Sequence, residues 1–313
     1  PDELVGHAAL SSVSDVDAAV NAAHSAFAAW SRTSYAERAA KLNEVAEYLE
    51  SGQDDVDQRA RLFCREHGKP IKETHLEVSR LGERFRMTAA YADRLARDKI
   101  EHGPPFDTII TRQPRGVAML IVPWNWPLSI LGAKLPQALM AGNTVVVKPS
   151  ELSVLAPGLT LQKIAEMFPP GVINIVTGDA AEIGDSLVGH PLVRFVNFTG
   201  SVRIGKHVMK VAADQMTPVT LELGGNDAAI VCADARLDET AFMNMYLGTF
   251  MSSGQVCMAL KRLYVHRSRY DEVIEGLEAV CNRMVVGDGL LPDTNMGPVN
   301  NAKQLQIITS MIE

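Results

Sequence analysis

The chain has 313 residues, enough for about two domains, each with a hydrophobic core. Its 30 lysines and arginines against 37 aspartates and glutamates leave a net charge of −7, which argues against a broad electrostatic grip on nucleic acid or an anionic membrane. A hydrophobic fraction of 47% with 21% charged residues is ordinary globular composition and excludes extended disorder. We therefore expect a folded protein whose partner is a small molecule.

The sequence carries no pattern typical of a secreted or membrane-spanning protein. Its first residues combine neither a basic segment nor an apolar one, so no secretory signal is visible. The most apolar stretch, 117–147, is interrupted by polar residues and a proline, which a bilayer span of about 20 residues disfavours. The four cysteines, Cys64, Cys232, Cys257 and Cys281, are too sparse for a disulfide framework. We expect a cytoplasmic protein with free thiols.

The amino-terminal third is predicted to be helical. Apolar residues recur at helical spacing over 16–30, after Ser14. Ser34 and Glu37 have the spacing of a capping box, which predicts the start of a second helix. A further periodic stretch over 72–97 predicts more helix before the Gly- and Pro-containing segment that follows.

From Val117 onward the pattern changes to strands alternating with helices. Short apolar or β-branched runs predict buried strands over 117–122, 144–148, 172–176, 193–198 and 219–223. The stretches between them predict helices over 128–140, 153–167, 180–188 and 202–213. A helix over 238–250 and a strand-like run over 261–266 come next. The alternation predicts an α/β fold with a doubly wound parallel sheet, in which ligands bind at the carboxyl ends of the strands.

Two of the predicted strand ends carry polar side chains in unusual turns. Asn125 stands between Pro123 and Pro127, each of which fixes the backbone beside it. It is either a held hydrogen-bond donor or an ordinary turn residue, and local sequence favours the turn. Lys148 and Glu151 follow the next strand, where they could hold the hydroxyls of a ribose or could simply be solvated charges. Neither motif decides a function alone.

A glycine-rich turn follows the strand over 193–198. Gly200, Gly205 and Lys206 satisfy a P-loop except at its last position, where His207 replaces the Ser or Thr that binds magnesium. The dinucleotide fingerprint GxGxxG is absent. A P-loop-like nucleotide-binding protein that uses Gly200–Lys206 therefore remains an alternative of a different class.

A carboxylate and a thiol complete the set of chemical candidates. Glu222 stands at a strand end beside two glycines, and Cys257 lies in a glycine-containing loop, where a reactive thiol would be accessible. Cys232 and Cys281 have apolar surroundings, which predict inert core positions. No cluster of histidines and cysteines has metal-ligand spacing, so we expect no metal site.

Taken together and in this order, the motifs resemble those of the NAD(P)-dependent aldehyde dehydrogenase superfamily. The stretches that carry the resemblance are Pro123–Pro127, Lys148–Glu151, Phe198–Ser201, Glu222–Gly225 and Gly254–Cys257. The resemblance implies a Rossmann-like NAD-binding domain over 1–222 and an incomplete catalytic domain over 223–313. Residues of about 100–115 would form part of an oligomerisation hairpin, in a homodimer or homotetramer.

The resemblance also implies a covalent mechanism. Cys257 matches the family nucleophile, which attacks an aldehyde to give a thiohemiacetal and then a thioester. Asn125, together with the backbone N–H of Cys257, would stabilise the oxyanion, which reverses the local preference for a plain turn. Glu222 matches the residue that activates water for hydrolysis to the carboxylic acid, and its presence disfavours transfer to coenzyme A. Lys134 falls on a family position near the site.

The cofactor implied by the resemblance is NAD. The residues expected at the cofactor are Trp124, Lys148, Glu151, Gly200 and Ser201. A carboxylate from Glu151 at the ribose would accept a hydrogen bond from the 2′-hydroxyl and repel a 2′-phosphate, so NAD is expected in preference to NADP.

The substrate is expected to be a small aldehyde with an apolar chain. Trp126, Val256 and Met258 match positions that line the family's substrate tunnel, and all three are apolar. The chain ends at Glu313, before family segments that contribute to the nicotinamide site and to oligomerisation. A non-catalytic, truncated relative is therefore a further alternative to an active enzyme.

Overall fold

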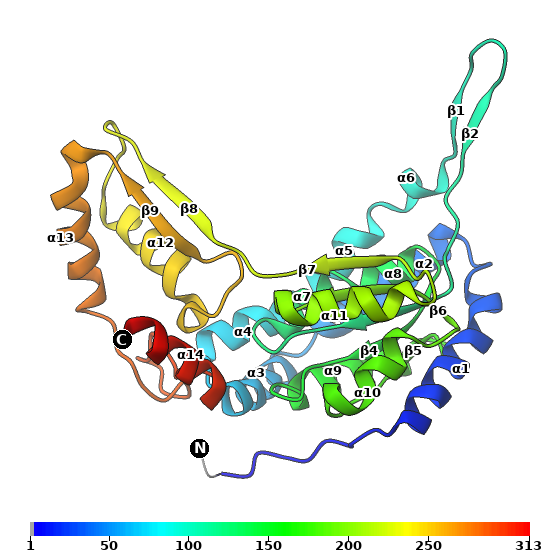
Figure 1. The fold of residues 1–313 in the computed structure, drawn as a ribbon, viewed down its shortest axis with the longest axis horizontal. Coiled ribbons are helices and arrows are strands. Elements are labelled where there is room, and N and C mark those ends of the chain that lie inside the picture. The colour runs from blue at the N-terminus through cyan, green and yellow to red at the C-terminus, as the bar shows by residue number, and fades with distance from the viewer. Residues whose placement is uncertain (1–2) are drawn as a thin grey trace. The chain divides into compact units, whose positions relative to one another are not determined.

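The computed structural model describes residues 3–313, which form two compact units (Figure 1). Unit 1 comprises the described residues up to Arg59 together with Glu77–Glu222, and unit 2 comprises Ala60–Leu76 and Leu223–Glu313. The division after Glu222 coincides with the expected domain boundary. Residues 60–76 differ from expectation, because they belong to the second unit rather than the first.

Unit 1 is built on a five-stranded parallel sheet with the strand order β5-β4-β3-β6-β7. Its strands are β3 (Val117–Ile121), β4 (Thr144–Lys148), β5 (Ile173–Ile175), β6 (Val193–Thr199) and β7 (Val219–Glu222). All five predicted strands are present, and β4 has the predicted bounds. Because β4 is buried along its whole length, its Val-rich run carries no alternation of apolar and polar residues.

Helices cover this sheet and link its strands. They are α1 (Val13–Trp30), α2 (Tyr35–Glu50), α5 (Leu81–Ala89), α6 (Ala92–Ala96), α7 (Pro127–Gly132), α8 (Leu135–Met140), α9 (Leu155–Glu166), α10 (Ala180–Val188) and α11 (Val202–Ala213). Helix α1 contacts β3, β4, β5 and α10, whereas α2, α5, α7 and α8 pack against one another. The capping box of Ser34 and Glu37 is present at the start of α2.

Three helical predictions need correction. Helix α1 begins after Ser12 rather than Ser14, because Ser12 forms a capping box with Asp15. The helix expected over 128–140 is two helices that break at Lys134, whose backbone leaves the helical region just before the proline-containing first turn of α8. The stretch over 72–97 is three short helices rather than one periodic segment.

A β-hairpin extends from unit 1 between α6 and β3 (Figure 1). Its antiparallel strands are β1 (Lys99–Glu101) and β2 (Thr108–Ile110), and every residue of both strands is exposed. Ile100, Phe106 and Ile109 are among its exposed apolar side chains. Exposed apolar residues concentrated on one hairpin are typical of a surface that pairs with another chain or segment.

Unit 2 has a smaller sheet of two parallel strands, β8 and β9. Its elements are β8 (Asp227–Val231), α12 (Glu239–Phe250), a 3₁₀ turn (Met251–Gly254), β9 (Leu260–Val265), a second 3₁₀ turn (Arg267–Arg269), α13 (Tyr270–Cys281) and α14 (Ala302–Ile312). Helix α12 packs on α13 and β9. Across residues 3–313, no helix has the combined length and apolarity needed to cross a bilayer.

Helices α3 (Gln53–His67) and α4 (Ile71–Ser79) carry the chain into unit 2 and back to unit 1. The connection between them packs closely against the carboxyl-terminal part of unit 2. A Cβ on Gly289 would lie 2.4 Å from the carbonyl oxygen of Lys69, and one on Gly297 would lie 1.9 Å from that of Gly68. Backbone approaches this close admit only glycine, which fixes residues 60–76 to unit 2.

Candidate active site

The strand ends of the unit 1 sheet bring the predicted motifs to one edge. Ile121 at the end of β3 pairs with Lys148 on one side and with Phe198 on the other. Thr199, the last residue of β6, pairs with Glu222, the last residue of β7. Because the strands are parallel, the loops that follow them emerge at the same edge, where ligands bind in sheets of this type.

Asn125 lies in the loop between β3 and α7, between the partly exposed Trp124 and Trp126. Helix α7 starts immediately after Trp126, and Pro127 is its first residue. The backbone N–H groups of Leu128 and Ser129 donate to a carboxylate oxygen of Glu77, at 2.8 and 2.9 Å. The turn that carries Asn125 is thus fixed on one side by a buried strand and on the other by an anchored helix start.

Lys134 is buried between α7 and α8, with 4% of its surface exposed. Its ammonium donates a hydrogen bond to the side-chain oxygen of Asn197 on β6. Burial lowers the pKa of Lys134 to about 8, and the carboxylate of Glu222 partly opposes that change. The charge of Glu222 thus acts on Lys134, so Lys134 lies near at least one of the predicted site residues of unit 1.

A cleft of about 970 Å³ lies over α10 and α11, and it contains Lys148 and Phe198 from the strand ends. Arg203, Lys206 and Lys210 also line it and give it a positive wall. A volume near the upper end of the usual range for ligand sites, with several cations, suits an anionic ligand of nucleotide size. Of the predicted cofactor residues, only Lys148 belongs to the lining of this cleft.

The turn between β6 and α11 has the geometry of a phosphate-binding helix start. A Cβ on Gly200 would lie 2.5 Å from the Phe198 ring, so a larger residue there would require this ring to move. The side-chain oxygen of Ser201 caps α11 by accepting from the N–H of Ile204, at 3.4 Å. The buried hydroxyl of Thr199 has no hydrogen-bond partner within residues 3–313. Close backbone approach and an unpaired hydroxyl fit the pyrophosphate of a dinucleotide.

Lys148 and Glu151 form the pair expected at a ribose. The Lys148 ammonium lies 3.3 Å from a carboxylate oxygen of Glu151. The lysine side chain is buried, whereas about half of the glutamate side chain is exposed. The carboxylate therefore keeps surface through which it can accept a hydrogen bond from a ligand.

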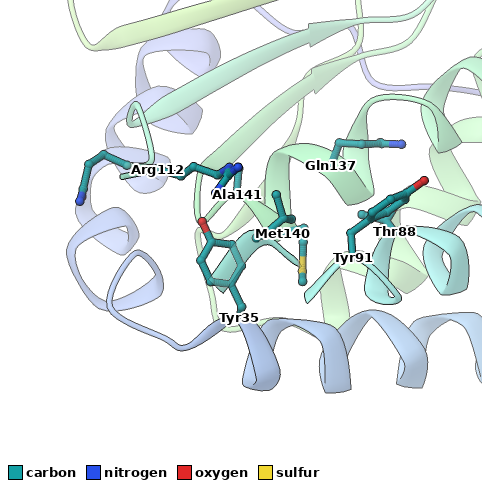
Figure 2. Close-up of a pocket in the computed structure, with 9 residues that line it drawn as sticks. Tyr35, Thr88, Tyr91, Arg112, Gln137, Met140 and Ala141 are labelled. Atoms are coloured by element: carbon teal, nitrogen blue, oxygen red, sulfur yellow. The ribbon is translucent and has the colours of Figure 1, made fainter. Parts of the chain in front are cut away.

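Another hollow of unit 1 is separate from these motifs. It has a volume of about 390 Å³ and lies among α2, α5, α6 and α8, with Tyr35, Tyr91 and Arg112 in its wall (Figure 2). None of the residues predicted to act in catalysis or cofactor binding lines it. We therefore assign the candidate site of unit 1 to the strand ends rather than to this hollow.

In unit 2, Cys257 is exposed and follows an unusual turn. Ser252, Ser253 and Gly254 have φ angles of +54°, +57° and +73°, a left-handed run that serines seldom adopt. The N–H of Ser252 donates to a carboxylate oxygen of Glu73 at 2.9 Å, and the Ser253 hydroxyl donates to the carbonyl of Gly297 at 2.8 Å. These bonds hold a backbone conformation that is strained in isolation.

Two further contacts fix the backbone of Cys257 itself. The ammonium of Lys261 donates to the carbonyl oxygens of Val256 at 3.0 Å and of Cys257 at 2.8 Å. A Cβ on Gly225 would lie 2.3 Å from the Cys257 carbonyl oxygen, so glycine is required beside the thiol. Val256 is partly exposed, and the side chain of Met258 is largely exposed.

The cysteines differ in accessibility, although not in the way predicted. Cys64 is buried, and burial raises the pKa of its thiol to about 11, which makes it a poor nucleophile. Cys232 and Cys281 are exposed, so the expectation that they occupy the core is wrong. Cys232 follows the end of β8 and Cys281 ends α13, and the apolar residues around them in sequence do not cover them. Exposure alone therefore does not single out Cys257, but its turn does.

Sequence reasoning missed Glu73 and Glu77, the two carboxylates of α4 that accept backbone N–H groups from the turns described above. Their spacing is that of an ordinary helix face.

The P-loop alternative gains no support, because His207, at the position of the magnesium-binding hydroxyl, instead lies 2.6 Å from the carboxylate of Asp185.

The family model described as "Aldehyde dehydrogenase family" matches residues 1–313. A 3-succinoylsemialdehyde-pyridine dehydrogenase from Pseudomonas sp is 38% identical over 313 residues, which are 99% of this chain and 64% of that protein. A point mutant of betaine aldehyde dehydrogenase from Staphylococcus aureus, solved in complex with NAD+, has a TM-score of 0.92 at 32% identity. The match covers 99% of this chain and 62% of that protein.

A solved E. coli NADP dependent enzyme has a TM-score of 0.92 at 33% identity, over 98% of this chain and 63% of that one. The chain spans 58% to 64% of the length of the curated relatives compared with it. The α/β fold with its parallel sheet, the ordered motifs at the strand ends and the match over residues 1–313 agree with one another. This chain belongs to the aldehyde dehydrogenase family.

Proposed function

We propose that this protein oxidises an aldehyde to a carboxylic acid with NAD as the hydride acceptor. The observation that carries the proposal is the family match over residues 1–313, with a thiol, an amide and a carboxylate at the motif positions. The exposed thiol of Cys257 on its fixed turn supports the role of nucleophile. Asn125 and Glu222, at the edge of the unit 1 sheet, support the roles of oxyanion donor and base.

The chemistry assigned to the chain's own residues has three parts. The Cys257 thiolate attacks the aldehyde carbonyl, and the carbonyl oxygen becomes the oxyanion of a thiohemiacetal. The side-chain amide of Asn125 and the backbone N–H of Cys257 donate to that oxygen; one such donor commonly contributes about 2.7–4 kcal/mol. Bound NAD supplies the acceptor for the hydride. Glu222 then takes a proton from the water that attacks the resulting thioester, which releases the acid and frees the thiol.

The proposed cofactor contacts involve the turns of unit 1. Gly200, Ser201 and Trp124 would contact the pyrophosphate and nicotinamide portions, and Lys148 with Glu151 would hold the adenosine ribose. The half-exposed carboxylate of Glu151 supports a preference for NAD, because it can accept from a 2′-hydroxyl and repels a 2′-phosphate. The relatives include one solved with NAD+ and one described as NADP dependent.

Cofactor choice is testable at Glu151. In Glu151→Ser the repulsion toward a 2′-phosphate is lost, so the ratio of kcat/KM for NAD to that for NADP should fall by about tenfold. Glu166→Ser, a change at an exposed carboxylate on α9, is a matched control that should leave the ratio unchanged. A ratio in Glu151→Ser equal to that of the unmodified protein would remove this residue from the ribose.

The proposed substrate is an aldehyde with an apolar chain. Trp126, Val256 and Met258 are the apolar residues assigned to the tunnel, and each has solvent-accessible surface. The names of the relatives include a semialdehyde dehydrogenase and a betaine aldehyde dehydrogenase, so polar aldehydes belong in any comparison. Aliphatic and aromatic aldehydes are expected to give higher kcat/KM than semialdehydes or betaine aldehyde.

The decisive experiment measures NAD(P)H formation from a panel of aldehydes. We expect turnover with at least one apolar aldehyde and none with Cys257→Ala, which should still bind NAD. Cys232→Ala, which removes another exposed thiol of unit 2, is the matched control and should retain activity. Turnover in Cys257→Ala equal to that of the unmodified protein would refute the proposed nucleophile.

A second candidate function is that of a non-catalytic relative. Such a protein would bind NAD in unit 1 without forming NAD(P)H from any aldehyde of the panel. The same measurements, with NAD binding followed by calorimetry, separate the two functions.

We also propose that the protein forms a homodimer or homotetramer through the β1–β2 hairpin. The exposed apolar side chains of Ile100, Phe106 and Ile109 support this role. The mass measured by light scattering should fall to that of a monomer when all three are replaced by Ser.

A further inference from the structure

Helix α4 carries two buried glutamates, one helical turn apart, that accept backbone hydrogen bonds from distant parts of the chain. Glu73 and Glu77 have 8% and 1% of their surface exposed. A carboxylate this buried is costly unless donors surround it, and backbone N–H groups are strong donors to an ionised oxygen. The unit boundary falls after Leu76, so each glutamate contacts a segment of its own unit.

Glu77 performs the function of an absent helix cap. The first helical residue of α7 is Pro127, and the residue before it is Trp126, whose indole can donate but cannot accept. The N–H groups of Leu128 and Ser129 therefore need an acceptor from elsewhere, and one oxygen of Glu77 accepts both. Asn125 lies two residues before α7, so this carboxylate fixes the end of the loop that carries the amide.

Glu73 holds the turn that precedes Cys257. It accepts from the N–H of Ser252, which is itself 1% exposed and starts the left-handed run of three residues. A serine at positive φ persists only where its surroundings hold it. The acceptor is 179 residues away in sequence, so this hydrogen bond comes from outside the turn.

We propose that Glu73 and Glu77 are positioning residues for the reaction: Glu77 sets the amide of Asn125, and Glu73 sets the turn that carries the thiol of Cys257. The inference rests on the proposed function for the roles of Asn125 and Cys257. It goes beyond that function by assigning their placement to two buried carboxylates that have no part in the proposed chemical steps.

A double-mutant cycle tests Glu77. In Glu77→Leu, the burst of NAD(P)H that reports acylation should slow by roughly 10- to 100-fold, since a misplacement of about 1 Å can cost about 100-fold. In the Asn125→Ala background the same change should slow the burst by less than about threefold, because the group that Glu77 positions is gone. Equal slowing in both backgrounds would show a general structural effect and overturn the proposal.

Asn143→Ala is the matched control for this cycle. The Asn143 side-chain oxygen also accepts two successive N–H groups, those of Arg115 at 2.7 Å and Gly116 at 3.2 Å. These residues precede β3, so this contact lies at the amino end of the strand rather than the carboxyl end. Asn143→Ala should lower the unfolding temperature without any coupling to Asn125→Ala. Coupling of the same size in both cycles would contradict a specific role for Glu77.

A readout that needs no activity accompanies the kinetics. Hydrogen exchange at Leu128 and Ser129 should be slow in the unmodified protein and faster in Glu77→Leu. If that variant does not fold, Glu77→Gln keeps an oxygen at the same place but is a weaker acceptor. It should accelerate exchange at these two amides more than elsewhere in unit 1 while keeping the burst within about threefold. Unchanged exchange in both variants overturns the proposal.

The role of Glu73 is tested by measuring two quantities, the rate of the NAD(P)H burst and the accessibility of the Cys257 thiol. Glu73→Leu should slow the NAD(P)H burst by roughly 10- to 100-fold. Alkylation of Cys257 by iodoacetamide should stay within about threefold, with Cys232 as the internal reference. Glu73→Gln should restore most of the burst. A burst that Glu73→Leu leaves unchanged, or parallel losses of burst and alkylation, would overturn this half of the proposal.

Failure of the proposed function gives a different pattern. If no aldehyde of the panel yields NAD(P)H, or if Asn125→Ala leaves the burst unchanged, the proposed function fails. Exchange at Leu128, Ser129 and Ser252 in the α4 variants then still decides whether the two carboxylates hold these turns. Retained protection in the variants refutes the positioning role whatever the activity.

Discussion

The sheets of the two units hold their functional residues in different ways. In unit 1, β3 and β4 are buried almost completely, and the segments that carry Asn125 and Lys148 lie where these two strands end. In unit 2, most residues of β8 and β9 are exposed or partly exposed, so burial contributes less there. The turn before Cys257 is held by a carboxylate that accepts from a backbone N–H and by a hydroxyl that donates to a backbone carbonyl. An ammonium donates to the carbonyl of Cys257 itself.

The contrast shows two physical routes to a placed functional group. The end of a strand in a packed core is positioned by hydrophobic contacts that tolerate little movement. A turn with positive φ angles and few buried apolar neighbours depends on individual hydrogen bonds and on glycines that allow close approach. Substitutions in the strands of unit 1 should therefore act mainly through packing, whereas substitutions around the turn of unit 2 should act mainly through particular polar contacts.

The largest expected effect comes at Glu222, the residue with which the unit 1 sheet ends. In Glu222→Gln the carboxylate that accepts a proton from water is lost, so the steady-state rate should fall about 10²- to 10⁴-fold. A burst of NAD(P)H should precede the slow rate, because acylation does not require this group. Because Glu222 is exposed, the free energy of unfolding should change by no more than about 0.5 kcal/mol.

Rapid-mixing absorbance at 340 nm and mass spectrometry of the acylated chain check this prediction. Glu182→Gln, at an exposed residue of α10, is the control and should show unaltered kinetics. A steady-state rate without a burst and equal to that of the unmodified protein would remove Glu222 from hydrolysis.

The second-largest expected effect is a difference in stability between substitutions in the sheets of the two units. Met119 on β3 has no exposed surface, whereas Ile230 on β8 is 75% exposed. Met119→Ala should destabilise unit 1 by about 2–5 kcal/mol, since it leaves a cavity in a close-packed core. Ile230→Ala should change the stability of unit 2 by about 0.5 kcal/mol or less. Urea unfolding followed separately in each unit measures both, and similar losses at the two positions would break the comparison.

The smallest expected effect is the pH dependence that arises from the buried Lys134. Burial lowers its pKa from 10.5 to about 8, which corresponds to on the order of 3 kcal/mol. Below pH 8 the lysine is charged in both the folded and the unfolded chain, so the penalty for burying the charge is fully present. Between pH 8 and 10.5 the unfolded chain binds more protons, so the stability contributed by this group rises with pH.

Lys134→Met isolates this contribution. The unmodified protein should gain stability relative to the variant as the pH rises from 8 to 10.5, and the difference should be constant below pH 7. Lys163→Met, at an exposed lysine of α9, is the control and should show no such slope. Parallel pH profiles of unfolding for Lys134→Met and the unmodified protein would show that burial does not perturb this lysine.

Much of unit 1 could be predicted from local sequence because its signals are local. The Val-rich run of β4 and the capping box of Ser34 and Glu37 each involve residues within a few positions of one another. Helices α10 and α11 have the predicted bounds for the same reason. The break at Lys134 was missed, because the apolar periodicity continues through a position whose backbone is not helical.

The candidate site was predictable only in part. The motifs predicted Asn125 and Cys257 in loops and Glu222 at a strand end, and these positions in the structure are a loop, a turn and the last residue of β7. The exposure of Cys232 and Cys281 was not predictable, because apolar neighbours in sequence need not be neighbours in space. Glu73 and Glu77 gave no signal, since a glutamate on a helix is ordinarily solvated.

The sequence by itself determined the succession of strands and helices along the chain, the motifs at their ends and the family to which the chain belongs. Only the tertiary structure assigned residues 60–76 to unit 2 and gave Glu73 and Glu77 their partners. Periodicity and capping act over a few residues, whereas Glu77 reaches Leu128 across 51 positions and Glu73 reaches Ser252 across 179. Contacts of that range exist only after the chain has folded, so no local pattern specifies them.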